Sequence, residues 1–365
     1  MFEIIFLVFL SLYFIQCVIF TIGSNRKFKT LTEDKLPTAT ILVAARNEEN
    51  NIVDCLNSLE KLQYPEGKLE IIIINDHSTD RTGELIGGFI KDKPKFKTII
   101  PQKGIGSLKG KANAIANGLE IASGEIILTT DADCTVSPTW AKTIASYYQQ
   151  DVALVCGYTD QFAPNAFHGM QSIDFIYLLA VAAGAMNLGK PLSAIGNNMS
   201  YRKSVYKEVG GYEKLPFSVT EDFALLMAMH GLKKYKIIYP LDSGGMVTSK
   251  ACPDLKSLFW QKKRWGVGGL DSDLIGFSVM AWGFVAHICM LLTPFFFSMN
   301  AIYMILFKFF VDYFFMFFVY QKLKLKLRFL HFLAFEIYFI IYVLVLPIAV
   351  GLNRNVKWKG REFKR

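Results

Sequence analysis

Long apolar segments near both ends of the chain flank a central part with a different pattern. Residues 1–24 contain a single charged side chain, Glu3, and residues 274–307 contain no Asp, Glu, Lys or Arg. One helix over the whole second segment would be about 50 Å long, whereas the hydrocarbon core of a membrane is about 30 Å thick. We therefore predict an N-terminal transmembrane anchor at 1–24 and two further spans at about 276–297 and 300–320.

The last part of the chain, residues 274–352, ends in a third apolar segment at about 329–350. It follows the basic stretch 322–328 and precedes a basic tail, 353–365. Three full C-terminal crossings would put the tail outside, but its positive charge favours the cytoplasm. We therefore predict that the third segment lies in the membrane interface or re-enters, and that the tail is cytoplasmic.

The basic residues Arg26, Lys27 and Lys29 directly follow the first apolar segment, which has no basic region before it. This arrangement favours an uncleaved anchor over a signal peptide and puts the central part in the cytoplasm. We expect a multi-pass integral membrane protein of the cell inner membrane.

Between residues 37 and 269, apolar β-rich runs alternate with helical patterns. This alternation predicts an α/β domain with a mainly parallel sheet. A helix is expected over 48–62, and the strands are expected at 38–46, 69–76, 96–100 and 125–133. All four runs look apolar on both faces, as buried parallel strands are.

Polar side chains stand where these strands end, and ligands of such sheets bind there. The residues are Arg46, Glu48, Asp76, Asp131 and Asp133, and we expect them to converge on one crevice. Asp76 could accept a hydrogen bond from a base or a ribose, or it could cap a helix. Asp131 and Asp133 could form a solvated turn, or they could share a hard divalent cation with a nucleotide diphosphate.

Three further stretches carry candidate chemistry. Lys111 lies at a predicted helix N-terminus, where an ammonium favours an anion, although exposed lysines are common there. Asp222 begins an apolar helix and could take a proton from a hydroxyl, or it could simply favour the helix dipole. Gln261, Arg264 and Trp265 share one helix face. This face suits a phosphate and a sugar or aliphatic group, but it also suits an interfacial helix.

The amino-acid composition excludes several classes of protein. A hydrophobic fraction of 52% with 31 Phe is too high for a purely soluble chain. The net charge of +9 comes from Lys and Arg that flank the apolar segments, where they would attract anionic lipid. Nucleic-acid binding would also explain this charge, but no motif supports it, so no nucleic-acid partner is expected. The six cysteines form no C-x-x-C pair, so neither zinc nor a disulfide framework is indicated.

Five motifs in this order resemble those of the membrane-anchored family 2 inverting glycosyltransferases, which include ceramide glucosyltransferases, carotenoid glycosyltransferases and the cellulose and hyaluronan synthases. The motifs are VAARNEE, NDHSTD, DAD, TED and QKKRW, and GNNMSYRKS and VKWKGR look like further family features. The resemblance covers nearly the whole chain. It implies a GT-A fold for residues 37–269, a UDP-sugar donor and Mg²⁺ or Mn²⁺.

The resemblance also implies roles for the candidate residues. The nucleotide-sugar site would comprise Ala44, Arg46, Glu48, Asp76, Lys111 and Asp131. Asp133, together with Asp131, would hold the metal, and Asp222 would be the general base. Gln261, Arg264 and Trp265 would close over the diphosphate and the acceptor.

We therefore expect a cytoplasm-facing enzyme that moves a single sugar from a UDP-sugar to a hydroxyl of a lipid acceptor and inverts the anomeric centre. One alternative is a processive polysaccharide synthase, for which about four membrane segments seem few. Another is a catalytically silent membrane scaffold, against which the intact Asp133, Asp222 and Arg264 argue.

Overall fold

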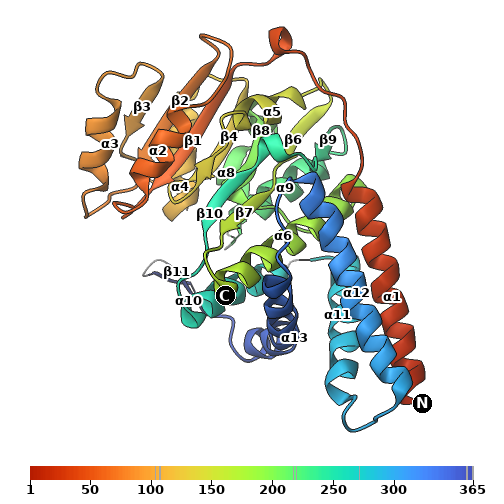
Figure 1. Cartoon of the computed structure of the whole chain (residues 1–365). Coiled ribbons are helices and arrows are strands. Elements are labelled where there is room, and N and C mark those ends of the chain that lie inside the picture. The colour runs from red at the N-terminus through yellow and green to blue at the C-terminus, as the bar shows by residue number, and fades with distance from the viewer. Residues whose placement is uncertain are drawn as a thin grey trace. The chain divides into compact units, whose positions relative to one another are not determined.

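The computed structural model describes residues 1–102, 104–106, 108–216, 218, 220–270, 272–358 and 361–363. The chain forms two compact units (Figure 1). The sheet unit comprises Arg26–Asp160 and Met186–Lys250. The helical unit comprises Met1–Asn25, Gln161–Ala185 and Ala251–Arg365. Two helices that fall inside the predicted 37–269 domain therefore group with the apolar helices instead.

The sheet unit is built on a seven-stranded sheet in the order β3-β2-β1-β4-β8-β6-β9. Its strands are β1 (Ala39–Ala45), β2 (Leu69–Asn75), β3 (Phe96–Ile99), β4 (Ile126–Asp131), β6 (Val152–Cys156), β8 (Met199–Arg202) and β9 (Lys236–Ile238). The strands β3, β2, β1 and β4 are parallel to one another, whereas β8 is antiparallel to both β4 and β6. The four predicted strands and the mainly parallel sheet are confirmed.

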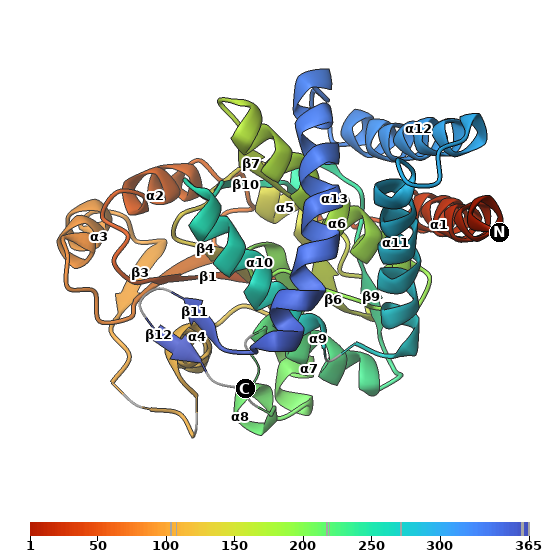
Figure 2. The same ribbon diagram turned by 90° about the horizontal axis from the view of Figure 1, so that it is seen from below.

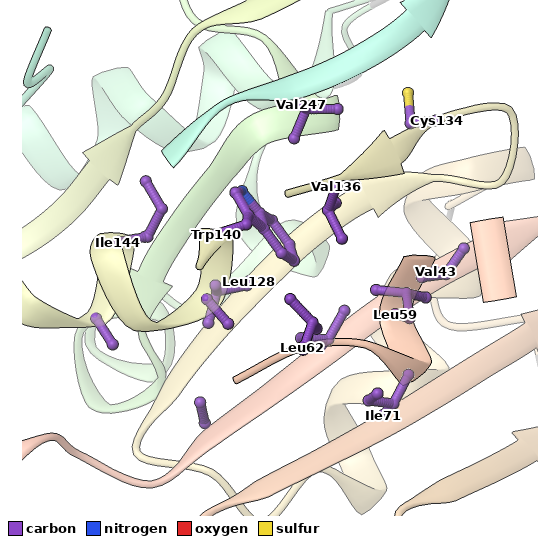
Figure 3. Packing of buried hydrophobic residues seen from close by; sticks show 14 of the residues in the cluster. Val43, Leu59, Leu62, Ile71, Leu128, Cys134, Val136, Trp140, Ile144 and Val247 are labelled. Carbon is purple, nitrogen blue, oxygen red and sulfur yellow. The ribbon is translucent and has the colours of Figure 1, made fainter. Parts of the chain in front are cut away.

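Side chains alternate between the two faces of this sheet. Ile41 and Val43 of β1 point to a core shared with α2 (Ile52–Glu60) and α5 (Trp140–Ser146). Figure 3 shows Trp140 of α5 lying among Leu128, Val136 and other apolar side chains of this core. The opposite face packs against α4 (Gly110–Ile121).

The contact with α4 depends on a glycine. A Cβ atom added at Gly118 would lie 2.8 Å from Ile74 Cδ1 and 3.2 Å from Leu42 Cδ2. The first distance is shorter than real Cβ contacts and the second is tighter than most, so any side chain at this position would force Ile74 to move or α4 to shift. The close approach keeps the start of α4 next to the end of β4.

Two local predictions for this unit are wrong. The strand β3 is not apolar on both faces, because Lys97 and Thr98 are exposed at the edge of the sheet. The helix α2 begins at Ile52 rather than at residue 48. Asn47 has a φ of 53°, which is left-handed, and the Glu48 N–H donates to the Thr82 hydroxyl at 2.8 Å, so the chain forms a turn there.

Shorter elements complete the sheet unit. The helices are α3 (Thr82–Ile90), α7 (Lys203–Glu208), α8 (Gly211–Lys214) and α9 (Glu221–Gly231), with 3₁₀ turns at Glu33–Lys35, Gly196–Asn198 and Ser243–Gly245. A second, three-stranded sheet has the order β5-β10-β7, with β5 at Thr135–Val136, β10 at Val247–Lys250 and β7 at Thr159–Phe162.

The helical unit contains α1 (Phe2–Ser24), α6 (Ala166–Asn187), α10 (Leu255–Gly269), α11 (Leu274–Leu292), α12 (Met299–Lys322) and α13 (Phe329–Leu352). Within the described residues, five of these helices, all but α10, are long and apolar enough to cross a membrane. The four predicted apolar segments are confirmed as helices. The sequence analysis missed α6, whose apolar window is 89% buried inside the protein, against 22–33% for the others.

The helix α13 runs at a steep angle to α1 and α12 and contacts α10 and α11. Figure 1 shows α1 and α12 side by side along their lengths, and the quarter turn to Figure 2 brings the length of α13 into view. The helix continues through Pro347, so it does not turn back as a re-entrant segment would. After it, β11 (Val356–Trp358) pairs with β12 (Arg361–Phe363) and contacts α10.

Charged side chains are buried among the apolar helices of this unit. Lys308 Nζ lies 2.7 Å from Asp312 Oδ2 and 2.6 Å from Glu336 Oε2, and all three side chains are fully buried. The Tyr13 hydroxyl donates to Asp312 Oδ1 at 2.6 Å and lies 2.7 Å from the Tyr177 hydroxyl. Charges in such surroundings require partners, and this network links α1, α6, α12 and α13.

Candidate active site

The acidic residues at the strand ends converge in the sheet unit. Asp131 is the last residue of β4, and its register partner in β1 is Ala44. Burial raises the pKa of the Cys55 thiol, and the charges of Asp133, Asp131 and Glu48 raise it further. All three carboxylates therefore lie close to Cys55, as the strand-end rule predicts.

Lys111 connects this acidic group to the start of α9. Its Nζ lies 2.5 Å from Asp131 Oδ1. Burial alone would lower the pKa of Lys111, but the carboxylates of Asp131, Glu221 and Asp222 raise it above its ordinary value. A Cβ atom added at Gly196 would lie 3.3 Å from both Lys111 Nζ and Asp222 Oδ2. The D-x-D and T-E-D motifs thus meet around one ammonium group.

Backbone N–H groups hold the Asp222 carboxylate in place. Its Oδ2 accepts from the Gly196 N–H at 2.7 Å, and its Oδ1 accepts from the Phe223 N–H at 2.8 Å. The Thr129 hydroxyl donates to the carbonyl oxygens of Gly196 at 2.8 Å and Met199 at 3.0 Å. The loop that holds Asp222 is therefore attached to the strand that ends in Asp131.

Sequence reasoning missed the role of Gly196. The motif GNNMSYRKS was noted, but no residue in it was assigned to the site. The available signal is Gly196 followed by two buried asparagines: the Asn198 amide donates to the Tyr158 and Gly245 carbonyls at 2.7 and 3.0 Å. Hydrogen bonds of this kind fix the conformation of the loop around Gly196. A rigid loop that binds the Asp222 carboxylate is typical of a preorganised site.

A second group of predicted residues lies beyond β2. Arg46 Nη1 is 3.6 Å from Asp76 Oδ2, and the Asp76 N–H donates to the Ala45 carbonyl at 2.8 Å. The next residue, His77, has a left-handed φ of 54°. It lines a cavity of about 270 Å³ together with Pro101, Gln102, Gly104 and Asn113.

Glu48 is buried beside these residues and accepts a hydrogen bond from the Asn51 side chain at 2.7 Å. In the structure it therefore shapes the turn before α2, and its predicted contact with the nucleotide stays a prediction.

The acids of the D-x-D motif offer oxygen ligands only. Cys134 follows Asp133, but burial, with the charges of Asp133 and Asp131, raises the pKa of its thiol well above the ordinary value. Among the described residues no group of three or more His, Cys, Asp and Glu side chains forms a metal site. Two partly exposed carboxylates fit a hard cation whose other ligands are diphosphate oxygens.

The remaining predicted residues lie together in the helical unit. Gln261, Arg264 and Trp265 are all on α10, whose N-terminus is capped by Asp254 through the Ser257 N–H at 2.8 Å. The prediction that they belong to one helix is confirmed. The structure thus forms two sets of candidate residues, one in each unit.

Two glycosyltransferase family models match this chain. Residues 40–210 match the family described as Glycosyl transferase family 2, and residues 126–352 match Glycosyl transferase family group 2. The second match covers more than half of the chain, and the chain belongs to this family group. The resemblance inferred from the motifs is confirmed at the level of the family.

Curated relatives include enzymes with two kinds of product. The chain is 28% identical over 260 residues to a beta-monoglucosyldiacylglycerol synthase of Nostoc sp., a match that covers 68% of this chain and 52% of the relative. It is 30% identical over 273 residues to a poly-beta-1,6-N-acetyl-D-glucosamine synthase of Staphylococcus aureus, covering 72% of this chain and 63% of the relative. The chain therefore spans about half to two thirds of the length of these relatives.

A solved structure resembles the fold over most of its length. It is a mannosyltransferase from Pyrobaculum calidifontis in complex with GDP-Man and Mn²⁺, 16% identical, with a TM-score of 0.61. The similarity covers 92% of this chain and 98% of that one. It confirms the predicted GT-A-like α/β fold.

Proposed function

We propose that this chain is a membrane glycosyltransferase that moves one sugar from a UDP-sugar to a hydroxyl of a lipid acceptor and inverts the anomeric centre. The observation that carries the proposal is the group formed by Asp131, Lys111 and Asp222. It joins the acid at the end of β4 to a second acid held by the Gly196 loop. A transfer that inverts needs a leaving-group site and a base on opposite sides of one carbon.

The donor would lie along the strand ends. Asp76, next to the cavity lined by His77, would accept from the nucleoside, with Ala44, Arg46 and Glu48 at its edge. Lys111 would contact a diphosphate oxygen, and Asp131 and Asp133 would hold Mg²⁺ or Mn²⁺. When bound, the cation would neutralise charge on the leaving diphosphate. The bound Mn²⁺ in the mannosyltransferase of the same fold is consistent with this assignment.

Asp222 would act on the acceptor. Its carboxylate would take the proton of the acceptor hydroxyl while the hydroxyl oxygen bonds to the anomeric carbon. The bond from that carbon to UDP would break at the same time, so the new bond forms on the opposite face. The two backbone N–H groups leave lone pairs free on both carboxylate oxygens for this proton.

The lipid acceptor and the membrane location rest on the helical unit. Helices α1, α11, α12 and α13 are long, apolar and largely exposed outside the protein core. One relative is named for synthesis of a glucosylated diacylglycerol, which supports a lipid acceptor. Gln261, Arg264 and Trp265 of α10 would contact the diphosphate and the acceptor. We infer that the sheet unit faces the cytoplasm.

The tail is proposed to lie on the same side as the catalytic residues. β11 contacts α10, and a Cβ atom at Gly266 of α10 would lie within 3.2 Å of Leu346 and Val350, near the end of α13. If α11 and α12 cross the membrane out and back, α13 begins on the membrane side where α10 lies. The end of α13 packs against α10, so both ends of α13 would lie on that side. An α13 that lies in the interface satisfies this condition.

The test is transfer by membranes that contain the protein. They are incubated with labelled UDP-glucose, UDP-galactose, UDP-N-acetylglucosamine and GDP-mannose, and the lipid and polymer fractions are separated. Label in a lipid with one sugar supports the proposal. A labelled long polymer would instead support the alternative of a processive polysaccharide synthase; the staphylococcal relative is named for synthesis of a polysaccharide. Absence of nucleotide release with every donor would support the silent scaffold and overturn the proposal.

A further inference from the structure

Two buried charges hold α10 against α6 in the helical unit. Lys262 of α10 forms an ion pair with Asp174 of α6, and the two side chains are 4% and 0% exposed. One turn earlier on α6, the Gln171 side chain donates to the Cys252 carbonyl at 3.0 Å and accepts from the Cys252 N–H at 2.9 Å. α6 therefore fixes both the chain that enters α10 and the helix itself.

The ion pair also determines the surroundings of Trp265. Lys262 and Trp265 are three residues apart on α10, and Lys262 Nζ lies 4.4 Å from the centroid of the indole ring. Phe175, the residue after Asp174, stacks on the same indole with centroids 5.4 Å apart and an interplanar angle of 15°. Neighbouring residues of α6 thus hold the ammonium group and the indole ring.

α13 also packs against α10. Lys262 Nζ lies 5.3 Å from the Tyr342 ring, which stacks on Tyr338 at 5.5 Å. A Cβ atom added at Gly266 would lie within 3.2 Å of Leu346 and Val350, so α10 packs closely against α13. The side of α10 next to Lys262 is therefore held by both α6 and α13.

Burial of this ion pair between two helices has a cost in desolvation free energy. Buried charges lose their hydration, and well-packed apolar residues in their place are often neutral or stabilising. Asp174 Oδ1 and the Tyr338 hydroxyl are buried and have no hydrogen-bond partner within the described chain, which adds to this cost. Stability alone therefore does not explain Lys262, and its position over Trp265 offers another reason.

We propose that Asp174 and Lys262 are positioning residues that set the orientation of the Trp265 indole for contact with the acceptor. The proposal rests on the proposed function, in which Trp265 contacts the acceptor. Lys262 itself occupies one of the two variable positions of the Q-x-x-R-W motif. Its role follows from the ion pair and from the cation–π contact.

The decisive variant is the double substitution Asp174→Leu with Lys262→Met. It removes both charges together, so no buried charge is left unpaired and the chain should fold. Lys256→Met, an exposed charge on the same helix, is the matched control. We expect the double variant to keep the melting temperature and UDP affinity of the wild type, while transfer to the lipid extract of the assay membranes falls about 10- to 100-fold.

A double-mutant cycle then separates positioning from a general loss of packing. If the pair acts through Trp265, removal of the pair in a Trp265→Ala background should cost less than about twofold in transfer. Equal fold losses in both backgrounds, or unchanged transfer in the double variant, would overturn the proposal. Lys262→Arg, which keeps the positive charge, should retain more transfer than the double variant.

One measurement does not depend on transfer. In hydroxyl-radical footprinting read by mass spectrometry, oxidation of Trp265 should rise in the double variant, whereas oxidation of Trp140 in the sheet unit should not change. Unchanged Trp265 oxidation would overturn the positioning role even if the wild type transfers sugar. Increased Trp265 oxidation in a protein that releases no UDP with any donor would support the positioning and overturn the proposed function.

Discussion

Replacement of Asp222 by Asn should affect two roles, because the carboxylate is the proposed general base and also anchors the Gly196 loop. Each oxygen accepts one backbone N–H, from Gly196 at 2.7 Å and from Phe223 at 2.8 Å. An Asn side chain has one acceptor oxygen, so one of these N–H groups would face an NH₂ group. Loss of one hydrogen bond to a charged acceptor costs about 1.5–3 kcal/mol.

The size of the rate effect follows from both losses. A general base contributes about 10²- to 10⁴-fold to the rate of proton transfer. Loosening of the loop could add a factor of about ten or more, since 1.4 kcal/mol corresponds to tenfold. We therefore expect Asp222→Asn to lose at least about 10²-fold in transfer. Its UDP affinity should stay close to that of the wild type, because the proposed nucleoside contacts are elsewhere.

Thr129→Val is the matched control. It removes the hydroxyl that donates to Gly196 and Met199 and leaves the Asp222 carboxylate in place. The assay compares UDP affinity by calorimetry and initial transfer rates for both variants. Thr129→Val should lose less than about tenfold. Near-normal transfer by Asp222→Asn, or equal losses in the two variants, would refute the catalytic base and make Glu221 the next candidate.

Three further outcomes are expected. Excess EDTA should abolish transfer and Mg²⁺ or Mn²⁺ should restore it, with Asp133→Ala more costly than Asp131→Ala; full turnover in EDTA would contradict the site. Lys111→Met should lower the melting temperature by a constant amount from pH 6 to 9. The pKa of Lys111 is raised in the folded protein, so the stabilisation by its ion pair is fully present below the ordinary lysine pKa of 10.5 and is lost only at higher pH. Equal melting temperatures of the two proteins at pH 8 would argue against the Lys111 pairing. Lys308→Met should destabilise the helical unit by about 3–5 kcal/mol, because Asp312 and Glu336 would be left buried without a cation; thermal unfolding in detergent measures this, and the additional changes Asp312→Asn and Glu336→Gln should recover much of the loss.

Much of the sheet unit could be predicted because its signals are local. Four apolar runs identified β1 to β4, and the strand-end rule brought Asp131 and Asp133 together with Glu48. The exposure of β3 was not predictable in the same way, because it follows from the place of β3 at the edge of the sheet, where only β2 pairs with it. Lys97 was the available sign of an exposed face.

The Gly196 loop could not be predicted because it depends on a contact between distant parts of the chain. β8 is only four residues long and is inserted antiparallel between β4 and β6. That pairing carries Gly196 to Thr129 and Asp222, which are separated from it by 67 and 26 positions. Similarly, Gln171 and Asp174 interrupt the apolar run of α6, and their partners Cys252 and Lys262 lie 81 and 88 positions further along the chain.

Charge balance connects the parts of the candidate site. Three carboxylates, those of Asp131, Glu221 and Asp222, act on the Lys111 ammonium group. A fourth acid, Asp133, lies two residues after Asp131. A nucleotide diphosphate would bring further negative charge to this place. Like charges at such distances are held together only when cations offset them. Donor affinity should therefore depend on the divalent cation, and Lys111 alone cannot replace it.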